Sequence, residues 1–108
     1  MVQAGGLEAE IKATVESNKV VVYSKSYCPF AGQTKTLLSS NGIDAKIFEL
    51  DQMGNGADIQ NTLKSMTGQS TVPNVWIAGK HIGGNSDIQA LGAAKVKEMI
   101  AWINIPIL

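Results

Sequence analysis

The sequence predicts an α/β domain with a mixed β-sheet, in which a parallel β-α-β unit is followed by an antiparallel hairpin. Two observations support this prediction. Short apolar runs at residues 20–23 and 45–50 alternate with segments whose apolar residues recur at helical spacing. Further on, the stretch VPNVWIAGKHIGG, at residues 72–84, holds two apolar runs around Ala78 and Gly79, a pattern typical of a hairpin.

The first half of this order begins with a helix, a strand and a second helix. Leu7, Ile11 and Val15 recur at helical spacing among charged residues, which indicates an amphipathic helix. The run VVVY at residues 20–23 is too short for a helix and lacks polar residues, which is typical of a strand buried on both faces. Pro29 suits the first turn of the next helix, because its missing N–H is not needed there.

The second half continues with a strand, a helix, the hairpin and a last helix. AKIFEL at residues 45–50 alternates as a strand does, and residues 59–68 show helical spacing that ends at a glycine. After the hairpin, Asn85 or Ser86 is expected to cap the last helix. Gly92 lowers the helix propensity in the middle of that predicted helix.

Length and composition narrow the classes of function. The chain has 108 residues, which suits one domain, and its formal net charge of zero argues against a nucleic-acid partner. No apolar run approaches the roughly 20 residues that a membrane-spanning helix needs, and residues 1–7 lack the pattern of a secretory signal. We therefore expect a soluble, cytoplasmic monomer without a nucleic-acid or membrane partner. An organellar form that has lost a targeting segment is the alternative.

The chain contains one cysteine, Cys28, in the frame SKSYCPF between the first strand and the second helix. A helix N-terminus offers free N–H groups and positive potential, and Lys25 adds a nearby cation. Both favour the thiolate, which is the species that attacks a disulfide, so we expect a partly exposed and reactive sulfur. The alternative is a small buried hydrophobic residue, the commonest fate of a free cysteine.

A second candidate stretch is STVPNV, at residues 70–75. A proline directly before an apolar strand cannot donate to the sheet and is expected at a strand start or an edge. A cis Val72–Pro73 bond would present the backbone of Val72 to an extended peptide, although most such bonds are trans.

A third candidate stretch is GKHIGGNSD, at residues 79–87. Gly83 and Gly84 lead into a helix start, where free N–H groups suit a carboxylate, and Asp87 suits an ammonium group. The pair would fit an amino-acid-like zwitterion. The alternative is a glycine turn with ordinary helix capping.

Taken together, the three stretches resemble the glutaredoxin family of the thioredoxin-like fold. The resemblance runs from about Leu7 to Trp102 and rests on SKSYCPF, GQSTVPNVWIAGKHIGG and SD in this order. These motifs match the dithiol subgroup, whose pattern is Cys-Pro-Tyr/Phe-Cys. The resemblance implies one glutaredoxin domain over residues 1–108, an α/β thioredoxin-like fold with a four-stranded mixed sheet flanked by about five helices.

The resemblance also implies roles for individual residues. Cys28 matches the nucleophile that takes glutathione from a glutathionylated substrate, and the Val72–Pro73 bond is expected to be cis. Phe30 keeps the ring of the usual tyrosine without its hydroxyl. The matching glutathione-binding positions are Lys25 and Gln69 for the glycine carboxylate, Val72 and Pro73 with Thr71 alongside for the cysteinyl backbone, and Gly84, Ser86 and Asp87 for the γ-glutamyl end.

Ala31 departs from the dithiol pattern, because it occupies the position of the resolving cysteine. We interpret it as a cysteine-to-alanine replacement, either engineered or natural. Without a second cysteine, a mixed disulfide between Cys28 and glutathione must be opened by another glutathione molecule. The resemblance therefore implies a glutathione-dependent oxidoreductase with a monothiol mechanism, which keeps deglutathionylation and loses dithiol reduction of protein disulfides.

Under this hypothesis we expect glutathione as co-substrate, glutathionylated proteins as partners and no metal. One alternative is a dimer that holds a 2Fe–2S cluster with two Cys28 thiolates and two glutathiones. Another is a thioredoxin-like binding module without catalysis. His81 in the predicted hairpin is expected to face solvent, and a catalytic base is its alternative role.

Overall fold

The computed structural model describes residues 4–103, which contain a four-stranded sheet in the order β2-β1-β3-β4. β1 pairs in parallel with β2, while β3 is antiparallel to both β1 and β4. The predicted β-α-β unit and hairpin are therefore confirmed. The strands are β1 (Val20–Ser24), β2 (Lys46–Glu49), β3 (Asn74–Ile77) and β4 (Lys80–Gly83).

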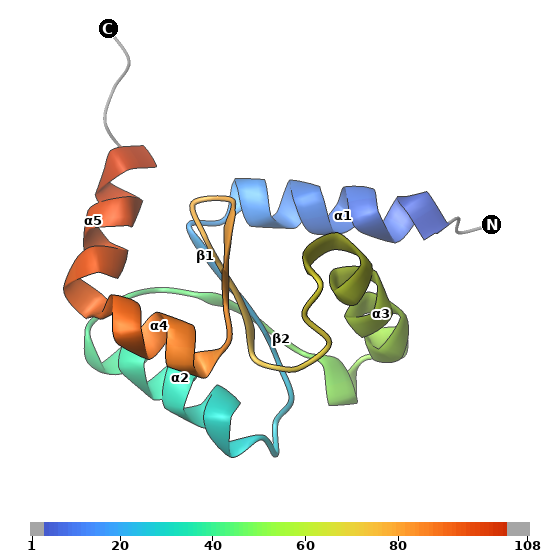
Figure 1. Cartoon of the computed structure of the whole chain (residues 1–108), viewed down its shortest axis with the longest axis horizontal. Coiled ribbons are helices and arrows are strands. Elements are labelled where there is room, and N and C mark those ends of the chain that lie inside the picture. The colour runs from blue at the N-terminus through green and yellow to red at the C-terminus, as the bar shows by residue number, and fades with distance from the viewer. Residues whose placement is uncertain (1–3, 104–108) are drawn as a thin grey trace, which may run out of the picture.

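Helices cover both faces of this sheet (Figure 1). α1 and α3 pack on one face, where α1 contributes Ile11 and Val15 to the core. α2, α4 and α5 pack on the other face. The helices within residues 4–103 are α1 (Ala4–Ser17), α2 (Pro29–Ser40), the short 3₁₀ helix η1 (Leu50–Gln52), α3 (Gly56–Thr67), α4 (Asn85–Leu91) and α5 (Ala93–Ile103).

β1 is buried on both faces, as its run of valines predicts. Val21 and Tyr23 belong to the core under α1 and α3, whereas Val20 and Val22 belong to the core under α2, α4 and α5. This alternation follows from the two-residue period of a strand. Because β1 is held from both sides, the turn that follows it has a fixed starting point.

The C-terminal region differs from the sequence prediction in two respects. The expected single helix is divided into α4 and α5 at Gly92, whose φ of 84° is not helical. The predicted caps are also wrong, because Gly84 is the N-cap of α4 and Asn85 is already its first residue. The carboxylate of Asp87 accepts a hydrogen bond from the Gly84 N–H at 2.9 Å. A residue in the first turn of α4 therefore provides the hydrogen-bond partner for the N–H of the N-cap.

No helix between Ala4 and Ile103 combines the length and the apolar character that a bilayer crossing requires.

Gly56 is a position at which the fold has no room for a side chain. It is buried at the start of α3, and a Cβ atom there would lie 1.8 Å from the backbone oxygen of Leu50 in η1. We expect Gly56→Ala to destabilise the protein by about 1–3 kcal/mol, because α3 and η1 must move apart. Gly54→Ala is the matched control, since a Cβ there meets no described atom within 4 Å. Urea unfolding checks this, and equal midpoints for the two variants would contradict it.

Candidate active site

Cys28 lies at the N-cap of α2, with Pro29 as the first helical residue. Its backbone N–H donates to the carbonyl of Lys25 at 3.1 Å, and its carbonyl accepts from the N–H of Gly32 at 3.0 Å. The side chain is half-buried, and its Sγ atom lies 3.8 Å from the carbonyl oxygen of Val72. The expected position and partial exposure of the sulfur are confirmed.

The loop that faces the sulfur leads into β3. Its Val72–Pro73 peptide bond is cis, as expected. Val72 packs against the core under α1 and α3, Pro73 is buried and Thr71 is exposed. The loop therefore places one backbone carbonyl beside Cys28, although the two residues are far apart in the sequence.

Gln69 holds this loop together. Its amide nitrogen Nε2 donates to the carbonyl of Thr71 at 2.9 Å and to the carbonyl of Pro73 at 2.8 Å. Both amide N–H groups thus have backbone acceptors inside the loop. The carboxylate contact that the resemblance implies for Gln69 stays a prediction.

The N-terminus of α4 borders the same loop. A Cβ atom on Gly84 would lie 3.7 Å from the carbonyl oxygen of Pro73 and 3.8 Å from Nε2 of Gln69. Ser86 and Asp87 are exposed in the first turn of α4. The three stretches singled out in the sequence are therefore adjacent at one end of the sheet.

Gly83 has to be glycine for the Asp87 cap to form. Its φ of 128° lies where side chains are rarely accommodated, and a Cβ there would lie 2.3 Å from Oδ2 of Asp87. The glycine pair thus allows β4 to turn directly into α4.

The remaining predicted positions lie within three residues of Cys28 in the sequence. Lys25 is half-buried in the preceding turn, and Phe30 is 60% exposed. Tyr27 is also exposed, so Cys28 has an exposed aromatic residue close to it on each side in the sequence. Ala31, by contrast, is 0% exposed and faces the core. Position 31 is therefore a buried site one helical turn from the sulfur.

Sequence reasoning missed a contact that fixes the turn before Cys28. Asp51, in η1, accepts hydrogen bonds from the backbone N–H of Ser26 at 2.9 Å and from its hydroxyl at 2.5 Å. The side-chain hydrogen bond of Ser26, with its backbone N–H and the Lys25 charge, holds the pKa of Asp51 below its ordinary value of 3.8. These contacts stabilise the turn fully above pH 3.8 and are lost as the pH falls through the lowered pKa.

The prediction for His81 is wrong, because the side chain is half-buried rather than facing solvent. Its Nε2 atom lies 3.0 Å from Oε1 of Gln69, and its ring meets the ring of Trp76 edge-on at 5.2 Å. Burial lowers the pKa of His81 below 6.5, while the Asp87 carboxylate acts in the opposite direction. His81 therefore joins the hairpin to the loop that faces Cys28.

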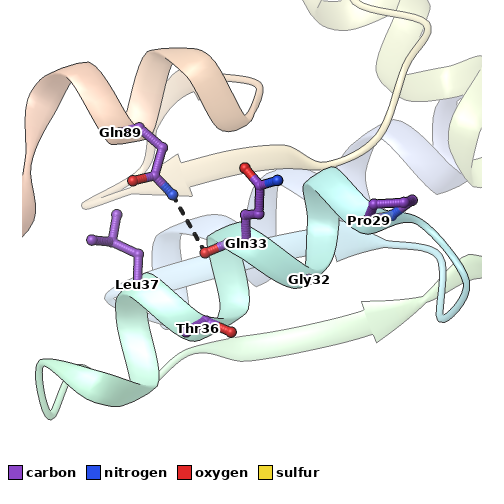
Figure 2. A pocket seen from close by; sticks show the side chains of 6 residues that line it. All are labelled: Pro29, Gly32, Gln33, Thr36, Leu37 and Gln89. Atoms are coloured by element: carbon purple, nitrogen blue, oxygen red, sulfur yellow. Dashed lines mark hydrogen bonds between the residues drawn. The ribbon is translucent and has the colours of Figure 1, made fainter.

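An open groove of about 560 Å³ runs along α2 beside this site (Figure 2). None of the positions that the resemblance implies for glutathione lines it. Gln89 of α4 donates to the backbone carbonyl of Gln33 at 3.4 Å and so closes one side of it. The residues that line it, all uncharged, are Pro29, Gly32, Gln33, Thr36, Leu37 and Gln89.

Within the part of the chain that the structure describes, no three His, Cys, Asp or Glu side chains gather as a metal site would require.

A cysteine at the N-cap of a helix, opposite a cis-proline loop on a four-stranded mixed sheet, defines a protein of the thioredoxin-like class. Within this class, a sequence profile described as Glutaredoxin matches residues 20–82. The chain therefore belongs to the glutaredoxin family.

Three similar proteins illustrate this membership. The chain is 46% identical over 100 residues to Monothiol glutaredoxin-S12, chloroplastic, of Arabidopsis thaliana, covering 91% of the chain and 56% of that protein. It is 53% identical over 83 residues to Glutaredoxin-C6 of Oryza sativa subsp. japonica, covering 77% and 74%. The crystal structure of the buckwheat glutaredoxin-glutathione complex superposes with a TM-score of 0.87 at 36% identity, covering 94% and 93%. The chain thus spans little more than half the length of the Arabidopsis relative.

Proposed function

We propose that this chain is a glutathione-dependent thiol–disulfide oxidoreductase that reduces mixed disulfides between glutathione and proteins or small molecules. The observation that carries the proposal is the position of Cys28, at a helix N-terminus with its Sγ 3.8 Å from the Val72 carbonyl. Membership of the glutaredoxin family supports it. So does the similarity to a buckwheat glutaredoxin whose structure contains glutathione.

The reaction has two exchange steps, both at Cys28. The Cys28 thiolate attacks the glutathione sulfur of the substrate, the substrate S–S bond breaks, and its electron pair leaves on the substrate thiolate, which takes a proton from water. A thiolate of a second glutathione then attacks the glutathione sulfur bound to Cys28. That step forms oxidised glutathione and returns the Cys28 thiolate.

The neighbouring residues would align glutathione for the first step. The backbone of Val72 would pair with the cysteinyl part, because its carbonyl already lies beside the sulfur. The N-terminus of α4, with Gly84, Ser86 and Asp87, would take the γ-glutamyl end, which carries both a carboxylate and an ammonium group. The exposed ring of Phe30 would border the thiol.

At the glycine end of glutathione, we propose that Lys25 supplies the positive charge and that Gln69 maintains the shape of the loop. The ammonium group of Lys25 is a cation on the turn before Cys28 and would attract the carboxylate. Gln69 uses both of its amide N–H groups on the carbonyls of Thr71 and Pro73. Its part would be to hold the carbonyls in place for the peptide-like body of glutathione.

Ala31 stands where the dithiol subgroup carries its resolving cysteine, which is why we propose a monothiol mechanism. Cys28 is the chain's one cysteine, so no internal disulfide can form during the cycle. The similarity to a relative named as a monothiol glutaredoxin supports this mechanism. The two origins considered for Ala31, an engineered replacement and a natural variant, lead to the same chemistry.

We also propose that residues 1–108 form one domain, that the protein acts as a monomer without a metal, and that glutathionylated proteins are its partners. The cytoplasm is the expected location. The chloroplastic Arabidopsis relative supports the organellar alternative.

A mass spectrum after incubation with oxidised glutathione tests the proposal, combined with turnover of a glutathionylated peptide in the presence of reduced glutathione. We expect one glutathione on Cys28 and release of the peptide thiol. An unmodified chain without turnover would indicate a binding module instead. Visible colour after anaerobic reconstitution with iron, sulfide and glutathione, without turnover, would indicate the 2Fe–2S dimer.

The contact between Ser26 and Asp51 gives a prediction about efficiency. We expect Asp51→Asn to lower kcat/KM for a glutathionylated peptide about two- to tenfold, because the turn that carries Lys25 and Cys28 loses its carboxylate acceptor. Asp44→Asn is the matched control. It removes the same charge from an exposed residue that precedes β2, at the opposite end of the sheet. Equal losses in the two variants would show that only net charge matters.

A further inference from the structure

We propose that His81 is a positioning residue for the proposed reaction: it holds the Gln69 side chain in the orientation that places the Val72 carbonyl beside Cys28. His81 lies on β4, and Gln69 follows the end of α3. The contact between their side chains joins β4 to the loop after α3, and neither segment has a backbone hydrogen bond to Cys28 among the described residues. The inference rests on the proposed function, because it assigns a role within that same site.

The orientation of the Gln69 amide is fixed by its neighbours. Two carbonyl oxygens, of Thr71 and Pro73, lie 2.9 and 2.8 Å from the Gln69 Nε2 atom. Carbonyl oxygens only accept hydrogen bonds, so the nitrogen of the amide has to face them. The amide oxygen Oε1 consequently faces His81.

The His81 ring must therefore carry a proton on Nε2. Its partner, the Oε1 atom of Gln69, lies 3.0 Å away and can only accept. Burial lowers the pKa of His81, so at neutral pH the ring is neutral with its proton on Nε2. His81 is thus a hydrogen-bond donor toward Gln69 in this site.

The hydrogen bonds continue from His81 toward the sulfur. Gln69 connects the ring to the carbonyls on both sides of Val72, and the Val72 carbonyl lies 3.8 Å from the Cys28 Sγ atom. Without the His81 donor, the Gln69 amide keeps only its hydrogen bonds to the Thr71 and Pro73 carbonyls, so its orientation against the loop is held less firmly. The Val72 backbone would then align glutathione less well.

A packing role for His81 is the competing explanation, because its ring also meets Trp76 edge-on at 5.2 Å. Two substitutions separate the roles. His81→Phe keeps an aromatic ring against Trp76 and removes the donor. His81→Gln removes the ring and keeps an N–H at a similar reach from the backbone. His81→Leu is a second variant without a donor, in case the phenylalanine does not fit.

The experiment measures kcat/KM for a glutathionylated peptide, the rate of Cys28 alkylation by iodoacetamide, and the thermal unfolding midpoint. Alkylation requires the thiolate but not the loop that would align glutathione. We expect His81→Phe and His81→Leu to lower kcat/KM about two- to tenfold, the usual effect of one lost hydrogen bond. Alkylation should stay within about twofold of wild type, and His81→Gln should retain kcat/KM within about twofold.

A double-mutant cycle adds a second readout. In a Gln69→Leu background, His81→Phe should cause no further loss, because the acceptor of its hydrogen bond is already gone. Equal losses in the Phe and Gln variants, no loss in the Phe variant, or full additivity in the cycle would each overturn the proposal. Wild-type protein without turnover would instead contradict the proposed function, so the two failures are distinguishable.

Discussion

Cys28→Ser is expected to reduce turnover of a glutathionylated peptide by about a thousandfold or more, down to the rate of glutathione alone. A serine hydroxyl is not ionised near neutral pH, so it cannot replace the thiolate as the attacking group. The chain has no other cysteine to take over. Release of the peptide thiol and the mass of the protein after the reaction are the measurements.

The same substitution should leave the fold intact, which makes the loss of turnover interpretable. Cys28 is the N-cap of α2, and among the described residues its side chain makes no capping hydrogen bond. Serine is a preferred N-cap, and its hydroxyl can accept from the N–H groups of the first turn. We expect Cys28→Ser to unfold at the wild-type temperature or slightly above it. Residual turnover above the glutathione background would show that Cys28 is not the nucleophile.

Most of the order of elements was predictable, because those elements have strong local signals, whereas η1 and the division between α4 and α5 were not predicted. The valine run of β1 is too short and too apolar for anything but a buried strand, and Pro29 marks the start of α2. Gly68 ends α3 with a φ of 81°, as a helix-stop glycine does. The hairpin turn at Ala78 and Gly79 has positive φ at both positions, the geometry that its flanking strands favour.

The partners of the site residues were not predictable, because they depend on contacts between distant segments. Ser26 and Asp51 are 25 positions apart, and Gln69 and His81 are 12 apart. The sequence around each of these residues does not indicate its hydrogen-bond partner. One signal existed for Asp51, since it follows a strand parallel to β1 and the carboxyl ends of parallel strands lie at the same edge of a sheet. No comparable signal existed for His81, whose alternatives were solvent exposure and catalysis.

The cap of α4 shows why a local rule can select the wrong residue. Asn85 and Ser86 are both good cap types, yet the N–H at the helix start is satisfied by Asp87. Asn85 instead accepts from the Thr34 hydroxyl at 2.9 Å and donates to Gln33 at 2.8 Å. Packing of α4 against α2 thus decides which side chain caps the helix.

Ala31→Cys is expected to give the protein a second activity, the reduction of protein disulfides. Position 31 is in the first turn of α2, three residues after Cys28, and this spacing at a helix start brings two sulfurs within bonding distance. In the variant, the introduced cysteine in its thiolate form would attack the mixed disulfide between Cys28 and a substrate protein, release the substrate thiolate and leave an internal disulfide. Reduced glutathione would then reopen that disulfide. Because the resolving thiol is held beside the bond it breaks, we expect about a tenfold or greater gain over wild type.

Ala31→Ser is the matched control for this gain. Position 31 is 0% exposed, and each substitution adds one heavy atom to this buried site, a sulfur in cysteine and a hydroxyl oxygen in serine. Any change that comes from filling the site should appear in both variants, whereas only the cysteine can form a disulfide. Two assays on wild type and both variants complete the test: turnover of a glutathionylated peptide and reduction of a protein disulfide. We expect the first activity in all three proteins and the second in Ala31→Cys alone. Equal protein-disulfide reduction by wild type and Ala31→Cys would show that position 31 has no resolving role, and the monothiol mechanism proposed for Cys28 would be wrong.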